Sequence, residues 1–455
     1  MVKKRLSLLL FLLASVAGFA QGTLDSLIRT GLGSNLGLQQ QNFALERSFA
    51  ALREARGLFL PSVTLLADYT YADGGRKIDI PVGDLMNPVY STLNQLTQSN
   101  AFPQIANVSE QFLPNDFHDT RLRLALPLIN AEIWYNEKIR REAYDGQQAA
   151  LAVYKRELVK DIRTAYYQFL RADQAVAIYA NAAKLLQDNR RLTETLVGNG
   201  LALRANLLRI DAELAKNEAA RAEAVNNREA ALRYLNFLLN RPQDTPVAVD
   251  TTLLTPSGET EVRDRGTWDE ARGAIGRREE LAQLERGIKQ SEYLVRMKRG
   301  YLLPTVNTFF DAGYQGFYYK FDDDQQYYLG GVQLRWNLFA GMTNTRKVQQ
   351  AEANLRELES KRAETEQQLE LQATTARLAL QSAQAQAAGT EAQERFSAEY
   401  YRQTLTRYRE GQALLLELTD AFTQWTNNRL ARNAARALTL VRQAELERAL
   451  AAYPF

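Results

Sequence analysis

Residues 341–453 form a run of about 110 residues that contains no proline and is rich in Ala, Gln, Glu, Leu and Arg. Near its far end Gly411 follows Tyr408 and precedes a second leucine-rich segment. We predict a long helix, a tight turn at Gly411 and a helix that returns along the first. At about 1.5 Å per residue the first helix would be roughly 100 Å long, whereas helices in globular proteins average about 11 to 12 residues. Such a helix must bury its apolar side against neighbouring helices, so the run predicts a coiled coil.

A second long helix is predicted in the first half of the chain. Its apolar residues follow one another at steps of three and four, which is the spacing of a coiled-coil seam. They are Leu151, Tyr154, Leu158, Ile162, Ala165, Phe169, Ala172, Val176, Tyr179, Ala183 and Leu186. A turn near residues 198–204 and a returning helix over about 205–239 would supply the partner of this seam.

Three motifs of the first half return in the same order in the second half, which predicts an internal duplication. They are RGLFLPSV (56–63) and RGYLLPTV (299–306), LALPLINA (124–131) and LRWNLFAG (334–341), and VGNG (197–200) and YREG (408–411). Each half is predicted to run helix, strand, strand, long helix, turn, helix. The first repeat covers residues 21–245 and the second 266–455. Residues 246–265 form a linker, since they hold Pro and Gly and show little periodicity.

Residues 1–20 have the pattern of a secretory signal peptide. Three cations precede a nearly uninterrupted apolar segment, which ends on small residues, and cleavage is expected after Ala20. Removing those three cations from the formal charge of +3 leaves 3 − 3 = 0, so the charge gives no argument for nucleic-acid binding. The chain has no cysteine, which excludes disulfides, thiolate metal sites and a lipid anchor on an N-terminal cysteine.

Two strand pairs interrupt the helices, at residues 61–128 and 304–339. In each pair apolar residues alternate with more polar ones over roughly a dozen residues per strand, and several are aromatic. The first pair contains a long insert, residues 72–119, with four prolines; we expect one short helix near residues 90–98 and an extracellular position. The second pair has a short tip at Asp322-Asp323-Asp324, where a solvated loop is a commoner arrangement than a divalent-cation site.

Alternating strands occur more often in a soluble sheet than in a membrane. Here the chain is expected to be exported, and the helices are too long to fold over a small sheet, which favours transmembrane strands. Four strands cannot close a barrel, and an open sheet edge is not tolerated in lipid. Three copies would supply 3 × 4 = 12 strands, which can close, so a homotrimer follows from the arithmetic. The predicted fold class is an α+β membrane protein.

We find no catalytic or cofactor-binding pattern, and we expect no enzyme activity and no cofactor. The single histidine, His118, stands at the start of a strand without a second histidine or a cysteine. The glycine pairs at residues 31–33 and 198–200 do not have the spacing of nucleotide-binding loops.

The two RGxxLP[ST]V junctions, the strand-to-helix exits at 127–129 and 337–341, and the turn from Tyr408 through Asp420 resemble those of TolC-type outer membrane efflux proteins. The resemblance covers nearly the whole mature chain. It implies a trimeric, 12-stranded outer membrane β-barrel with four strands per chain, continuous with a periplasmic tunnel of coiled-coil helices. Such channels lie in the outer membrane lipid and receive substrates from an inner-membrane pump through a periplasmic adaptor protein, in efflux or in type I secretion.

The same resemblance implies site residues at the periplasmic mouth. The selectivity acids of the family correspond to Glu417 and Asp420, which are three residues apart and therefore on one face of a helix. Three copies would bring together 2 × 3 = 6 carboxylates, although two ordinary surface acids would look the same in the sequence.

The turns and the closing contacts correspond only in part. Gly200 and Gly411 are expected to have left-handed backbone conformations that end the two long helices. Tyr408 of the family's closing contact is present, but its acid corresponds to Asn206 and its arginine to Ala413. The closed state cannot rely on the same salt bridges.

Two other functions fit parts of the pattern. A periplasmic coiled-coil scaffold would account for the helices but not for the alternating strands, and a passive porin would account for the strands but not for the helices. The exported substrate cannot be predicted from this sequence, because in such systems the pump selects it.

Overall fold

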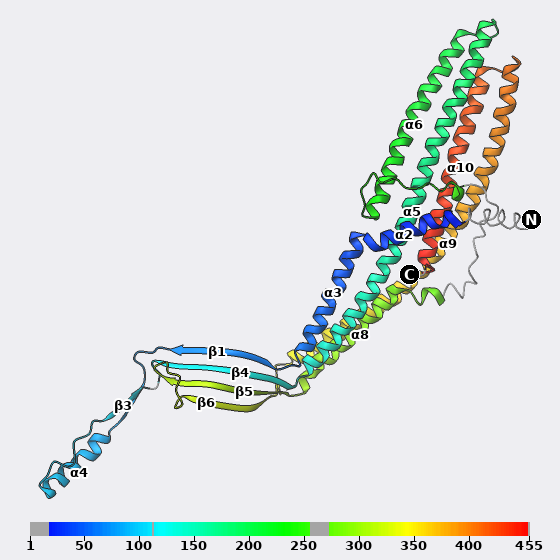
Figure 1. Ribbon diagram of the computed structural model, residues 1–455. Coiled ribbons are helices and arrows are strands. Elements are labelled where there is room, and N and C mark those ends of the chain that lie inside the picture. Colours follow the sequence, from blue (N-terminus) through cyan, green and yellow to red (C-terminus); the bar gives the residue numbers. More distant parts are fainter. Residues whose placement is uncertain (1–17, 112, 255–272, 454–455) are drawn as a thin grey trace, which may run out of the picture. The chain divides into compact units, whose positions relative to one another are not determined.

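The computed structural model describes residues 18–111, 113–254 and 273–453, so the predicted signal peptide lies almost wholly outside them. The predicted linker is described only as far as Leu254. The chain divides into two compact units (Figure 1). Of the described residues, the helical unit comprises 18–50, 141–254, 273–291 and 353–453, and the sheet unit comprises 51–111, 113–140 and 292–352.

The elements follow the same order in both halves. The first half contains α2 (Gly18–Ser34), α3 (Leu36–Gly57), β1 (Ser62–Thr70), β4 (Phe117–Ile129), α5 (Ala131–Gly198) and α6 (Arg204–Leu238). The second contains η1 (Thr251–Leu254), α8 (Glu279–Arg299), η2 (Gly300–Leu302), β5 (Thr305–Phe317), β6 (Gln326–Arg335), α9 (Thr343–Arg409) and α10 (Leu415–Ala449). The insert between β1 and β4 adds β2 (Lys77–Ile80), α4 (Val82–Thr97) and β3 (Val108–Gln111). The duplication predicted from three motifs is therefore present in the structure.

Asn35 divides the first helix of the first repeat, which the predicted order of elements treats as one continuous helix. Its side-chain carbonyl accepts a hydrogen bond from the Leu38 amide at 2.9 Å, and its amide donates to the Leu238 carbonyl at 2.9 Å. An asparagine that caps the following helix ends the preceding one, because its own backbone leaves the helical conformation. The first helix is thus two helices, α2 and α3.

The four long strands form one antiparallel sheet in the order β1-β4-β5-β6. The registers place apolar side chains on one face, namely Val63, Leu65, Leu122, Leu124, Phe310, Tyr328, Val332 and Leu334. All eight are exposed in the single chain. Within this sheet β1 and β6 each pair on one side only, so the sheet has two open edges.

The other face of the sheet carries ion pairs. Arg123 donates two hydrogen bonds to the carboxylate of Asp311, at 2.8 and 2.7 Å. Arg121 is bound to Asp119, which also accepts a hydrogen bond from the Tyr327 hydroxyl at 3.1 Å. A sheet with one apolar and one charged face separates two different environments.

The insert is more ordered than its prolines suggest. Residues 77–80 and 108–111 pair as a small antiparallel sheet, and α4 covers residues 82–97, so the predicted short helix near residues 90–98 begins too late. Pro88 lies in the second turn of this helix, where it lacks the amide that would bond to the Asp84 carbonyl, and Asp84 supplies an acid in the first turn.

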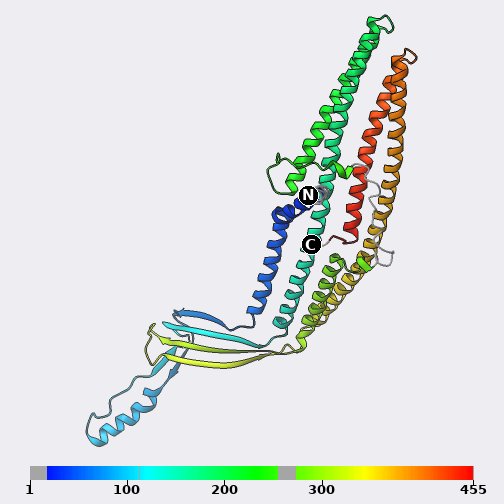
Figure 2. The ribbon, with the colours of Figure 1, turned by 45° about the vertical axis from the view of Figure 1, so that its right-hand side comes forward.

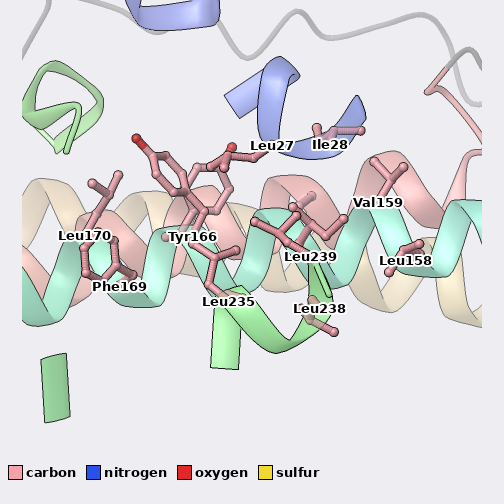
Figure 3. Packing of buried hydrophobic residues seen from close by; sticks show 14 of the residues in the cluster. Leu27, Ile28, Leu158, Val159, Tyr166, Phe169, Leu170, Leu235, Leu238 and Leu239 are labelled. Atoms are coloured by element: carbon pink, nitrogen blue, oxygen red, sulfur yellow. The ribbon is translucent and has the colours of Figure 1, made fainter. Parts of the chain in front are cut away.

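The core of the helical unit lies where α2, α5, α6 and α10 meet. Leu27 and Ile28 of α2 share one buried cluster with Tyr166 and Leu170 of α5 and with Leu235 of α6 (Figure 3). The predicted seam of α5 is buried at Leu158, Ile162, Ala165, Phe169 and Leu186. Between Phe169 and Leu186 it is wrong: Ile178 and Ala182 are buried instead of Val176, Tyr179 and Ala183. Over a 68-residue helix the 3.6-residue turn drifts away from a 3.5-residue repeat, so the buried stripe changes position.

Charged side chains join four helices of this unit. Glu280 of α8 accepts hydrogen bonds from Arg448 of α10 at 2.7 Å and from Arg278 at 2.7 and 3.1 Å. Arg448 also binds Glu157 of α5 at 3.0 Å, and Arg278 binds Gln372 of α9 at 3.0 Å. Burial alone would raise the pKa of Glu280, but the hydrogen bonds from Arg278 and Arg448 outweigh it and lower the pKa to about 2.

Glu280→Gln is expected to change how the thermal stability of the protein depends on pH. A carboxyl whose pKa is lower in the folded state stabilises the fold above its unfolded pKa, near 4.5, and loses this contribution as the pH falls toward about 2. The wild-type midpoint of thermal unfolding should therefore fall steeply in this window, while the variant starts lower at neutral pH and falls less. Parallel midpoint curves for the two proteins would show that the pair network does not stabilise the unit.

None of the helices in the described part of the chain combines the length and the apolar character needed to cross a bilayer. Among the same residues, which include Asp322 to Asp324, no group of three or more His, Cys, Asp or Glu side chains is placed to hold a metal ion.

Candidate functional site: the two helical hairpin tips

The two helical hairpins end in turns of the same local geometry. Gly200 and Gly411 both have φ of 73°. The next amide donates to the carbonyl five residues back, from Leu201 to Leu196 and from Gln412 to Arg407, each at 2.8 Å. Each glycine amide donates to the carbonyl three residues back, at 3.1 Å. This pair of bonds is the Schellman arrangement, which ends a helix with a left-handed residue.

The returning helices also begin alike. Leu203 and Leu414 are their N-cap residues, with extended φ and ψ of −84° and 144° and of −82° and 152°. Neither cap forms a side-chain hydrogen bond to its helix, although Ser, Thr, Asn or Asp is usual at this position. Both returning helices therefore begin at an apolar residue that offers no side-chain cap.

Leucines surround both turns and point into solvent. The exposed fraction is 73% for Leu201, 73% for Leu203 and 70% for Leu208 at the first tip, and 68% for Leu414 and 46% for Leu416 at the second. These five leucines were not predicted from the sequence as site residues. What they share in the sequence is a position within eight residues after a turn glycine.

The two hairpins are packed on each other just behind the turns (Figures 1 and 2). Leu186 of α5 and Ile210 of α6 share a buried cluster with Tyr401 of α9 and with Leu418 and Phe422 of α10. Burial of large side chains gives this end of the unit its own core, separate from the cluster at α2.

Two buried polar pairs join α5 directly to α9. The Thr193 and Tyr408 hydroxyls share a hydrogen bond of 2.9 Å, and the Asn189 amide donates to the Tyr401 hydroxyl at 3.1 Å. On the surface Arg190 of α5 donates to Asp211 of α6 at 2.7 Å. Buried polar pairs fix the register of neighbouring helices, because a slip by one turn would leave four buried groups without partners.

Glu417 and Asp420 lie on α10 next to this cluster. Glu417 is half-buried and occupies the first turn, where a carboxylate also interacts favourably with the helix dipole. Asp420 is exposed. Their neighbours Leu418 and Ala421 are fully buried, so the two acids lie at the border of the packed cluster and can face a space outside it.

Comparisons with known proteins agree with this architecture. Residues 272–452 match the model of the family described as outer membrane efflux protein. The outer-membrane channel OprN has a TM-score of 0.76 at 19% identity, over 94% of this chain and 90% of that one. The outer membrane protein VceC of Vibrio cholerae has a TM-score of 0.74 at 17% identity, over 94% and 96%. The open-state outer membrane channel MtrE of Neisseria gonorrhoeae has a TM-score of 0.74 at 18% identity, over 94% and 88%.

The chain has the outer membrane efflux protein fold. The resemblance to that family and the α+β class, both predicted from the sequence, are confirmed. At identities of 17–19% these solved structures show that the fold is shared, and no more than the fold. A comparison with curated protein sequences gives no match.

In this efflux protein fold the three residues predicted at the closing contact, Tyr408, Asn206 and Ala413, differ in burial and in their partners. Tyr408 is buried and its hydroxyl is bound to Thr193 of its own chain. Asn206 is half-buried, and its backbone amide donates to the Leu203 carbonyl at 2.9 Å. Ala413 packs on the buried cluster. Around Tyr408 the contact between the hairpins is therefore a neutral hydrogen bond.

Gly411→Val is expected to loosen the second tip. No atom lies within 4 Å of a Cβ added at Gly411, so the cost comes from the backbone, because a β-branched residue at φ of 73° is strained by roughly 1 kcal/mol or more. Gly198→Val is the matched control, since a Cβ there is equally free of contacts and no left-handed φ is required. The midpoint temperature of thermal unfolding of the purified protein should be lower for Gly411→Val than for the wild type, and unchanged for Gly198→Val. Equal midpoints would remove the strain argument.

Proposed function

We propose that three copies of this chain form an outer membrane efflux channel. The observation that carries the proposal is the four-stranded sheet with one apolar face, one charged face and two open edges. Pairing β1 of one copy with β6 of the next would satisfy both edges, and 3 × 4 = 12 strands would close. The apolar face would then meet lipid and the charged face would line the pore.

The helical unit would form a tunnel on the periplasmic side, with the hairpin tips at its entrance. Three copies of Glu417 and Asp420 would give that entrance a negative potential, which attracts cations and cationic substrates. The five exposed leucines of the tips offer apolar contacts to a periplasmic adaptor protein, which in turn would connect the channel to an inner-membrane pump.

The channel would act as a conduit, in efflux or in type I secretion. No covalent step is needed: the charged face keeps the pore wetted, and the neutral contact of Tyr408 with Thr193 would hold the hairpins together at rest. Movement of α9 against α5 would break that one hydrogen bond and the pair of Asn189 with Tyr401, so opening would not require the separation of buried ions.

The trimer is tested by cross-linking in a chain that has no cysteine of its own. Leu65→Cys on β1 and Val332→Cys on β6 lie on the apolar face of opposite edge strands. With a thiol cross-linker of several lengths, the double variant should give a covalent species of three chains, and each single variant should not. Val63→Cys with Leu124→Cys is the control, because these residues pair within one chain.

The same preparation, reconstituted in planar bilayers, should carry single-channel currents that are small at rest. A protein that remains a single chain under every cross-linker and passes no current would overturn the proposal. Large, permanently open currents would favour a passive porin.

A further inference from the structure

Helix α4 has one face that is already occupied by its own chain. Asn87 exchanges two hydrogen bonds with the backbone of Ile105, both at 2.9 Å, and Asn94 exchanges two with the backbone of Phe102, at 2.7 and 3.0 Å. A Cβ at Gly83 would lie 2.4 Å from the Ile105 carbonyl oxygen, so this face approaches the returning segment very closely. Residues 102–107 thus run along α4 and fix which of its sides points outward.

The outward side of α4 is an apolar seam, which we define as Leu85, Val89, Thr92 and Leu96. Leu85 is 70% exposed, Val89 50% and Leu96 76%. Their spacing of 4, 3 and 4 residues is that of a coiled-coil seam. The Thr92 hydroxyl donates to the Pro88 carbonyl at 2.9 Å, so it is satisfied within the helix and does not require water.

The composition around the seam favours a second copy of the same chain as its occupant. From Leu85 to Asn107 the chain has no Asp, Glu, Lys or Arg. Identical surfaces can meet there without like-charge repulsion, whereas a lipid headgroup or a charged partner would find no complementary side chain. The insert also leaves the sheet from the end of β1, an edge strand, so it is attached at the boundary where the next copy would pair.

We propose that the α4 helices of the three copies pack on one another through the seam and form a helical cap at the outer end of the barrel. The inference rests on the proposed trimer. The hydrogen bonds of Asn87 and Asn94 to the returning segment fix the orientation of each α4 helix for this contact. Three helices packed in this way would narrow the extracellular opening. The insert would thereby give the channel a constriction of its own, in addition to the one proposed at the hairpin tips.

The test uses single cysteines in the cysteine-free chain. Val89→Cys and Leu96→Cys place a thiol in the seam, and Gln95→Cys places one on the exposed flank beside it. Disulfides form only when the two Cα atoms come within about 7 Å. On mild oxidation of the purified trimer, the seam variants should give mostly covalent dimers, because two of three thiols can pair, and severalfold less dimer should appear for Gln95→Cys.

The edge cross-link of Leu65→Cys with Val332→Cys separates the possible failures. If the edges cross-link and the seam thiols do not, the cap is wrong and the trimer stands. If neither cross-links, the trimer itself is wrong, and the cap with it. If the seam cysteines in whole cells attach to a different protein and not to a second copy, the cap is likewise overturned, and a foreign partner of α4 replaces it.

Discussion

Leu65→Arg is expected to prevent stable membrane insertion of the sheet. Leu65 lies in the middle of β1 on the apolar face, and its side chain is 66% exposed in the single chain. In the proposed barrel this face meets the hydrocarbon core, where an arginine costs about 2–4 kcal/mol near the midplane. A loss of that size is comparable to a large part of the stability of most folds. The variant should be degraded or recovered in the soluble fraction.

Leu66→Arg is the matched control for this prediction. It changes the same residue type at the neighbouring position of the same strand, whose side chain points to the charged face. Arg121 lies directly across from it, and this like-charge pair should cost at most about 1 kcal/mol. Heat-resistant assembly in outer membrane fractions is the measurement. If both variants assemble equally well, the apolar face does not contact lipid.

The sheet could be predicted because strand periodicity gives a definite answer. With a period of two, a shift of one residue would turn every apolar side chain to the wrong face, so the alternation of Leu122 and Leu124 with Arg121 and Arg123 already assigns the faces. The helix-to-strand junctions were equally readable, since Pro61 and Pro304 cannot continue a helix.

The helix boundaries that could not be predicted from the sequence depend on contacts between distant segments. At the break, Asn35 is bound to the carbonyl of Leu238, and in the first turn of α4 Gly83 lies close against the Ile105 carbonyl. Neither partner is visible in a local pattern. The predicted short helix in the insert therefore started too late, and α2 and α3 were read as one helix.

At the candidate site, too, local features could be predicted from the sequence and long-range contacts could not. The turns at Gly200 and Gly411 were predictable, because glycine after a long helix is a local signal. The hydrogen bond between Thr193 and Tyr408 joins residues 215 positions apart, and only the packing of α5 on α9 brings them together. The exposed leucines of the tips escaped notice because leucine near a helix end is ordinarily a packed residue.

Neutralising Glu417 and Asp420 together is expected to abolish the cation preference of the channel. Both acids lie on one side of α10 beside the tip, and three copies would crowd six negative charges around one entrance. Their potentials add wherever the charges are closer than the Debye length, about 8 Å at physiological salt. Glu417→Gln with Asp420→Asn removes the charge while keeping the size of both side chains, so the hairpin should still fold.

The measurement is the reversal potential of single channels in a salt gradient, together with block by divalent or trivalent cations. The wild type should favour cations and should be blocked from the side of the hairpin tips, and both effects should be lost in the double variant. Glu357→Gln with Glu359→Gln makes the same charge change at exposed positions of α9, away from the tip, and should leave selectivity unchanged. If the two double variants behave alike, summed charge and not its position sets the preference. If the Glu417 and Asp420 variant keeps the wild-type selectivity, the entrance lies elsewhere, and Glu417 serves the fold through the dipole of α10.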